Sequence, residues 1–162
     1  MSAALLTDQL EASLGLVNWR SEDEIRSLIA DWEDALRSRD LPLLLSFYGG
    51  DIVLFDVQPP FRTAGLSAVR QLWEESLPLF PETFRIERRD LHIAADGATA
   101  FAHWLFRLCD CPTDHPVSRV WMRVSAGYRK QHGGWKIVHE HVSLPMDPTT
   151  LRADFIPNFF SE

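Results

Sequence analysis

Polar residues that can move protons recur at alternate positions in the last predicted strand. The segment "WKIVHEHVSLP", Trp135 to Pro145, contains His139, His141 and Ser143. Strict alternation places all three on one face with Trp135 and Ile137, and places Val138, Glu140, Val142 and Leu144 on the other. A face this polar predicts a solvated pocket or a buried hydrogen-bonded network, because unpaired polar groups are costly in a core. Histidine titrates near neutral pH, so His141 in particular is a candidate for proton transfer.

A second candidate for proton transfer is Asp56, at the end of an earlier strand. Alternation places Ile52, Leu54 and Asp56 on one face, so the carboxylate follows two aliphatic residues into apolar surroundings. Burial raises the pKa of a carboxyl group and makes it a better base near neutral pH. The alternative is a structural aspartate that accepts hydrogen bonds from turn amides ahead of Pro59 and Pro60.

Two further strands add possible pocket residues. His103 lies in "AFAHWLF", on the same predicted side as Phe101 and Arg107. The next strand presents one of two alternating sets, and we expect the polar one to line the pocket: Arg119, Trp121, Arg123 and Ser125 rather than Val120, Met122, Val124 and Ala126. The guanidinium of Arg123 suits a substrate carboxylate or enolate, or a structural partner such as Asp56. Hairpin register is not fixed by the loop, so the cross-strand partners stay open.

The histidines also permit two readings without acid–base chemistry. They could bond to one another, to Glu140 or to backbone groups, and so stabilise a dimer surface. Two alternating histidines with His103 from a neighbouring strand is also a geometry that zinc enzymes use, and Asp56 could complete it. Such short spacings arise often by chance, and no cysteine or second carboxylate accompanies them, so we expect no metal and no cofactor.

The elements that must position these residues follow from periodicity. Apolar residues at three- and four-residue spacings predict an amphipathic helix over 21–39, with Ser21 and Glu24 as a capping box. Shorter helices are predicted over 41–47, with Asp40 as cap, and over 67–77; residues 1–20 also look helical. Strands are predicted over 51–57, 83–93, 99–108, 117–130 and 135–144. Helices followed by a mostly antiparallel sheet indicate an α+β fold.

These segments resemble the SnoaL-like family, which is related to ketosteroid isomerase and nuclear transport factor two. The stretches that carry the resemblance are "FYGGDIVLFDVQPPFRTAGLSAVRQLW", "ATAFAHWLFRL" and "WMRVSAGYRKQHGGWKIVHEHVSLPMD". The resemblance implies a curved sheet folded against three N-terminal helices into a cone with a pocket in its mouth, and frequent dimerisation through the outer sheet face. It covers residues 21–147, the SnoaL-like domain, and leaves an N-terminal helical arm (1–20) and a tail (148–162). The tail holds three phenylalanines, Phe155, Phe159 and Phe160, which need cover on the body or on a partner chain.

The same resemblance aligns Asp56 with the proton-shuttling aspartate of ketosteroid isomerase, an enzyme known for tuned carboxyl groups. The positions aligned with that enzyme's oxyanion hole are Trp32 and Ser125. An indole N–H and a hydroxyl each donate one hydrogen bond but are much weaker acids than a phenol or a carboxylic acid. Steroid isomerisation is therefore not expected, and Trp32 also fits the apolar stripe of its helix.

Composition limits the partners. The chain has 162 residues, 46% of them hydrophobic, which suits one domain with a real core. A formal charge of -7 argues against nucleic acid as a partner. No apolar run approaches the ~20 residues of a membrane-spanning helix, and no signal peptide is visible, so we expect a cytoplasmic protein. Cys109 and Cys111 lie two apart on a predicted strand end and are not expected to form a disulfide.

Two functions follow as hypotheses. The first is a cofactor-free enzyme that moves a proton on an apolar carbonyl substrate, of isomerase, cyclase or dehydratase type. Asp56 would be its base, His141, His103 and Arg123 would orient substrate or stabilise an enolate oxygen, and Trp32, Trp121, Ser125, His139 and Ser143 would bind substrate. The second is a non-catalytic module that binds a small apolar or acidic ligand or serves to form a homodimer.

Overall fold

The computed structural model describes residues 3–112, 118 and 120–153. In this part of the chain, three α-helices and a short 3-10 helix accompany six strands. The helices are α1 (Ala3–Ser38), α2 (Leu41–Ser46), α3 (Leu66–Ser76) and η1 (Leu77–Leu79). The strands are β1 (Tyr48–Phe55), β2 (Thr63–Ala64), β3 (Arg85–Asp96), β4 (Thr99–Cys109), β5 (Met122–Gln131) and β6 (Gly134–Ser143). The α+β class is confirmed, and each predicted strand is present with ends shifted by a few residues.

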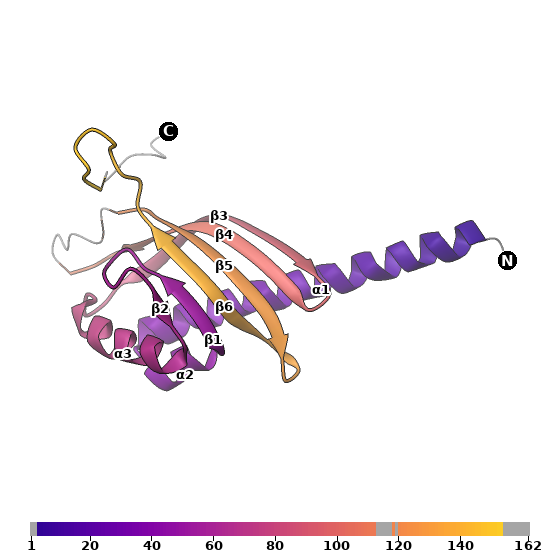
Figure 1. Cartoon of the computed structure of the whole chain (residues 1–162), viewed down its shortest axis with the longest axis horizontal. Coiled ribbons are helices and arrows are strands. Elements are labelled where there is room, and N and C mark those ends of the chain that lie inside the picture. The colour runs from indigo at the N-terminus through magenta and orange to yellow at the C-terminus, as the bar shows by residue number, and fades with distance from the viewer. Residues whose placement is uncertain (1–2, 113–117, 119, 154–162) are drawn as a thin grey trace.

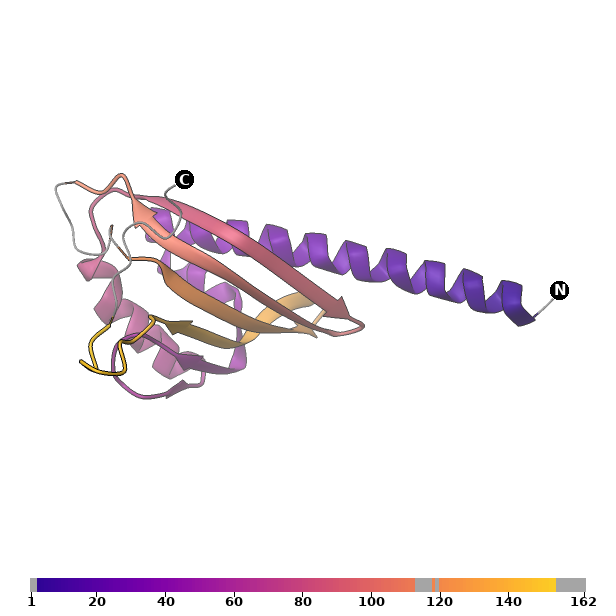
Figure 2. The ribbon, with the colours of Figure 1, turned by 90° about the horizontal axis from the view of Figure 1, so that it is seen from above.

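The six strands form one curved sheet in the order β2-β1-β6-β5-β4-β3. β1 and β6 are parallel, and the other neighbours are antiparallel. The helices lie together on one side of the sheet, and α1 packs mainly against β3 (Figures 1 and 2). The sheet therefore has an inner face toward the helices and an outer face away from them, as expected for the cone.

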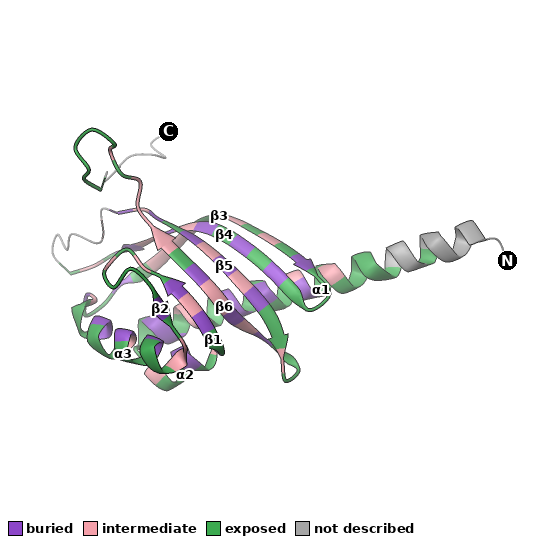
Figure 3. Cartoon of the chain, viewed as in Figure 1, coloured by how far each residue is buried: buried purple, intermediate pink, exposed green. Residues whose placement is uncertain are grey.

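The core fills the space between α1 and the inner face. Ile25, Ile29 and Leu36 of α1 are at most 2% exposed, as the predicted stripe required. On β4, every second residue from Ala100 to Leu108 is buried, and this alternation is visible as purple bands across the strands in Figure 3. Burying one such aliphatic side chain stabilises a fold by about 1.5–3 kcal/mol, so this layer holds the sheet on the helices.

The predicted start of the first long helix at Ser21 is wrong. α1 is continuous from Ala3 to Ser38, and Ser21 lies inside it, buried, where its Oγ accepts a hydrogen bond from Lys130 Nζ at 3.5 Å. The first half of α1 extends beyond the body as an arm (Figure 1). No proline or other helix breaker separates the two predicted helical segments, so they join into one.

The second helix begins as predicted. Asp40 precedes α2 and its side chain accepts a hydrogen bond from the Leu43 backbone N–H at 2.9 Å. Pro42 lies in the first turn, where the missing N–H costs nothing. α2 thereby leads directly into β1, which carries Tyr48 at its start and Asp56 just past its end.

β6 contains an irregularity that controls which of its residues face inward. On β5, Tyr128 pairs with Ile137 and the preceding residue, Gly127, pairs with His139. Val138 of β6 therefore has no partner in this register and is an extra residue of the strand. Such a β-bulge reverses the alternation of side chains beyond it. Trp135 and Ile137 face inward before the bulge, and Glu140 faces inward after it.

The chain after β6 forms a short loop in which Met146 bridges Ala153. The three phenylalanines for which the sequence predicted a cover, at 155, 159 and 160, lie outside the described residues. Among the helices of the described ranges, none combines the length and apolar character needed to cross a membrane.

Candidate functional site

A cavity of about 240 Å³ lies between the helices and the inner face of the sheet. Four of its lining residues have polar side chains that can transfer protons or form hydrogen bonds: Asp56, Gln58, Ser76 and Glu140. The remaining lining is apolar or aromatic: Trp32, Leu36, Leu54, Val57, Leu72, Trp73, Phe80, Phe106, Leu108, Met122 and Val142. No lysine, arginine or histidine is among these lining residues, so the cavity is an apolar space with two carboxyl groups.

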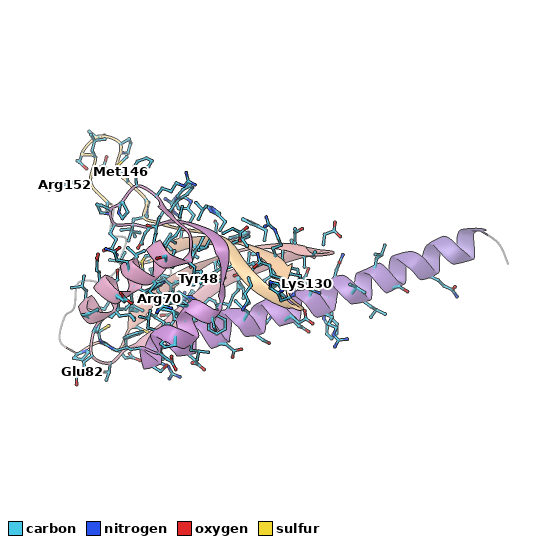
Figure 4. The ribbon with its side chains drawn as sticks, turned by 60° about the horizontal axis from the view of Figure 1, so that its bottom comes forward. Tyr48, Arg70, Glu82, Lys130, Met146 and Arg152 are labelled. Atoms are coloured by element: carbon cyan, nitrogen blue, oxygen red, sulfur yellow. The ribbon has the colours of Figure 1, made fainter. Side chains whose placement is uncertain are left out.

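Glu140 is the most deeply buried carboxyl group of the cavity, with 5% exposure. Tyr48 donates a hydrogen bond from its hydroxyl to Glu140 Oε2 at 3.0 Å, and Trp32 Nε1 donates to the Tyr48 oxygen at 3.0 Å. The three residues come from β6, β1 and α1. They form a chain of donors that ends on one oxygen of the carboxyl group. Tyr48 lies in the middle of the body, between helices and sheet (Figure 4).

This environment changes the acidity of Glu140. Burial raises its pKa to about 7, the hydrogen bond from Tyr48 opposes the rise, and the charge of Asp56 adds to it. Burial, with the neighbouring Glu140, also raises the pKa of Tyr48 well above its usual range, which keeps the phenol neutral. Glu140 is thus a carboxyl group that exchanges its proton near neutral pH.

Asp56 lies where the sequence placed it, on one face with Ile52 and Leu54. It is half-buried and lines the cavity. Burial raises its pKa, against two hydrogen bonds that lower it. The Val57 backbone N–H donates to Oδ1 at 2.6 Å, and Gln58 Nε2 lies 3.4 Å from Oδ2. The structural alternative from the sequence therefore also holds in part, because a turn amide does bind this aspartate.

Gln58 links Asp56 to the helical side of the cavity. Its Nε2 also donates to Ser76 Oγ at 2.9 Å, at the end of α3. Leu54 of β1 pairs with Glu140 of β6, and Asp56 follows Leu54 by two residues, roughly 6.6 Å along the chain at ~3.3 Å per residue. The carboxyl group of Asp56, just past the end of β1, therefore lies near that of Glu140, and its charge contributes to the raised pKa of Glu140.

The histidines of β6 do not face this cavity, so the expected arrangement of that strand is wrong. His139, His141 and Ser143 lie on the outer face because the bulge at Val138 reverses the alternation. His139 Nδ1 is 3.0 Å from the Val53 carbonyl oxygen, and both imidazoles pack edge-on against Phe55. Glu140, which the sequence assigned to the opposite side from the pocket, takes their place.

Trp121, Arg123 and Ser125 of the predicted polar set also lie on the outer face, and Arg119 lies outside the described residues. Met122, Val124 and Ala126 are buried on the inner face, so the expectation that the polar set lines the pocket is wrong. Ser125 pairs with His141 on one side and with His103 on the other. The outer face thus carries a row of polar residues along β4, β5 and β6.

The other predicted site residues belong to that outer face. His103 stacks on His92 with ring centroids 5.1 Å apart. Trp121 lies beneath Arg107, 4.7 Å from the guanidinium carbon to the ring centroid. Arg123 is exposed and donates from Nη2 to the Leu144 carbonyl at 3.0 Å. None of these three residues lines the cavity; of the predicted set, Asp56 and Trp32 do.

Residue-level reasoning missed Glu140 and Tyr48. The available signal for Glu140 was Gly127, an isolated glycine inside a strand, which often marks a bulge. A bulge in this hairpin would have moved Glu140 inward. Tyr48 gave no comparable signal, because its importance depends on its contacts with Trp32 and Glu140.

Within residues 3–112, 118 and 120–153, no three or more histidine, cysteine, aspartate or glutamate side chains are grouped so that they could hold a metal ion. What the cavity can do is accept and donate protons: two carboxyl groups with raised pKa values share an apolar space.

The fold and this cavity define a small α+β pocket protein in which a curved sheet wraps against three helices. The family model of the SnoaL-like domain matches residues 25–147, and the chain belongs to this family. No match is found among curated proteins.

Solved structures agree with this assignment. An NTF2-like protein of unknown function from Pseudomonas putida KT2440 is 38% identical, with a TM-score of 0.77, covering 84% of this chain and 94% of that one. An NTF2-like protein with a cystatin-like fold from Novosphingobium aromaticivorans is 20% identical, with a TM-score of 0.68 over 88% of this chain and 92% of that one. A cystatin-like-fold protein from Nostoc punctiforme is also 20% identical, with a TM-score of 0.64 over 78% and 90% of the two chains. The last two support the fold alone.

Proposed function

We propose that the chain is a cofactor-free enzyme that transfers a proton on a small, uncharged, largely apolar molecule bound in the inner cavity. The observation that carries this proposal is the pairing of Asp56 and Glu140 in a cavity that no basic side chain of the described residues lines. Acid–base catalysts work best when their pKa lies near the working pH, and burial gives Glu140 a pKa of about 7.

The different surroundings of the two carboxyl groups suit one to act as a base and the other as an acid. Asp56 is half-buried and receives hydrogen bonds from Val57 and Gln58, which favour its ionised form and suit it to act as the base. Glu140 is fully enclosed and uses Oε2 to accept the bond from Tyr48. Its Oε1 is then the oxygen that presents a proton to an acceptor on the bound molecule, so Glu140 acts as the acid.

The cavity also restricts the charge and size of the ligand. Among the described lining residues no cation accompanies the two carboxyl groups, so their charge repels an anion. Of the apolar or acidic ligands expected from the sequence, we therefore propose the uncharged, apolar class. A cavity of about 150 Å³ holds benzene in another protein. A cavity of about 240 Å³ therefore suits one ring with a few substituents, one of them an oxygen that accepts a hydrogen bond from Glu140.

The test uses proton exchange on a probe ketone. Acetophenone incubated with the protein in D₂O should lose its methyl proton signals by NMR faster than in buffer. Asp56→Asn should lower the protein-dependent rate by about 100-fold or more, the usual contribution of a general base. Asp51→Asn is the matched control, because Asp51 lies on the same strand, is exposed and pairs with Arg129 at 2.9 Å. Equal exchange in Asp56→Asn and wild type, at unchanged melting temperature, would refute the catalytic role.

A second candidate function is a module that binds a ligand without chemistry or forms a homodimer. The outer face favours it, because Phe55 and Phe101 are exposed there beside the histidine row. Exposed aromatic residues are common at protein interfaces. Native mass spectrometry of wild type and Phe101→Glu distinguishes the cases: a dimer that the variant dissociates supports this candidate, and a monomer in both counts against it.

A further inference from the structure

A second hollow, of about 530 Å³, lies on the other side of the segment that ends β1. It shares three consecutive lining residues, Asp56, Val57 and Gln58, with the inner cavity. The two spaces are therefore separated by one short stretch of chain. That stretch is thin, because Val57 is 47% exposed and Asp56 lines both sides.

The outer hollow differs in chemistry from the inner cavity. It is bounded by the aromatic rings of Phe55 and Phe61 and by the imidazole of His141. Phe61 is completely exposed, at 101%, and Phe55 packs edge-on against His141 with centroids 5.9 Å apart. Flat rings and an imidazole that can donate or accept a hydrogen bond suit a planar group with a polar substituent.

The sizes of the two spaces complement one another. Pockets for drug-sized ligands usually measure about 300–1,000 Å³, and the inner cavity alone falls below that range. A molecule that filled only the inner cavity would leave the exposed ring of Phe61 uncovered. A longer molecule that passes over Val57 would cover Phe61 and reach His141.

We propose that the outer hollow is a second subsite, which binds the distal planar part of an elongated ligand whose apolar head occupies the inner cavity. This inference rests on the proposed function in one respect, that the inner cavity binds a ligand. It names the substrate class: two planar groups joined by a short linker, with the reacting carbonyl next to the inner group and a polar substituent on the outer one. His141 then contributes to specificity and not to proton transfer.

The experiment compares two probes, acetophenone and 4-hydroxychalcone. In the chalcone, a vinyl linker joins the benzoyl group found in acetophenone to a phenol ring. Binding to the full chain is measured by isothermal titration calorimetry. The chalcone should bind at least tenfold more tightly than acetophenone. Phe61→Ala and His141→Ala should each weaken chalcone binding about fivefold and change acetophenone binding less than twofold.

Matched controls come from the same outer face, away from the hollow. Phe101→Ala and His103→Ala remove an exposed aromatic ring and an exposed imidazole of β4, and should affect neither probe. Equal affinity of the two probes, or equal losses for both in Phe61→Ala and His141→Ala, overturns the subsite. Failure of both probes to bind overturns the subsite and the inner-cavity function together, whereas tight acetophenone binding without a gain for the chalcone overturns the subsite alone.

Discussion

The two faces of β6 place adjacent residues in opposite surroundings. Glu140 points into an apolar cavity, is 5% exposed and has a pKa raised to about 7 by burial. Its neighbours His139 and His141 lie on the outer face, where they contact Phe55. The residue types alone would rank the histidines as the acid–base groups. Enclosure therefore selects the reactive group, because burial makes a glutamate titrate in the range usually associated with histidine.

Removal of the bulge at Val138 should have the largest effect on this difference between the two faces of β6. Deleting Val138 restores strict alternation, so that either Glu140 and Val142 turn outward or Trp135 and Ile137 leave the core. Either outcome exposes apolar groups or buries imidazoles, and we expect the free energy of unfolding to fall by about 4 kcal/mol or more. Urea denaturation followed by tryptophan fluorescence measures it.

Val138→Ala is the control for this deletion. It keeps the extra residue and shortens a half-buried side chain, so its cost should stay near 1 kcal/mol. A deletion variant as stable as Val138→Ala would show that the bulge does not set the orientation of β6.

The same bulge explains why only part of the site could be predicted from the sequence. Helical spacing, caps and strand alternation depend on local interactions, so the elements and the inward face of Asp56 could be predicted from them. The orientation of Glu140 depends on one extra residue opposite Gly127, and a one-residue error reverses the whole end of the strand. The chain from Trp32 through Tyr48 joins three elements distant in sequence, which no local pattern reveals.

A second prediction concerns stability against pH on the inner face. The native state holds the Glu140 proton more tightly than the unfolded chain does, because the pKa rises from 4.5 to about 7 on folding. The free energy of unfolding should therefore fall as the pH rises from 4.5 to about 7, by about 3 kcal/mol in total. Above pH 7 it should change little from this cause. Glu140→Gln removes this titrating group. When the pH is raised from 4.5 to 8, the free energy of unfolding of the variant should therefore fall by about 3 kcal/mol less than that of wild type.

Denaturation midpoints across this pH range test the prediction. Asp96→Asn is the comparison variant, because Asp96 is an exposed carboxylate at the end of β3 and does not line the cavity. The same pH slope in Glu140→Gln and wild type would contradict the buried, proton-binding state of Glu140.

A third prediction sharpens the role of the hydrogen-bond chain. The hydrogen bond from the Tyr48 hydroxyl to Glu140 Oε2 favours the ionised carboxylate, and Tyr48→Phe removes it. The pKa of Glu140 should therefore rise further, by about one unit if the bond contributes about 1.4 kcal/mol. Carbon-13 NMR of the Glu140 carboxyl carbon measures the shift. Tyr128→Phe is the control: the Tyr128 hydroxyl is also buried but has no hydrogen-bond partner among the described residues. An unchanged Glu140 titration in Tyr48→Phe would assign Tyr48 a packing role only.

The smallest expected effect is on the outer face, at Arg123. Its guanidinium is exposed and makes one hydrogen bond to the Leu144 carbonyl, which contributes little because water competes for both groups. Arg123→Ala should therefore change the free energy of unfolding by less than about 0.5 kcal/mol, as exposed positions usually do. It should also change the exchange rate of acetophenone less than twofold, because the residue does not line the cavity. A tenfold loss of exchange at unchanged stability would move the chemistry to the outer face and reverse the contrast between Glu140 and the outer polar row.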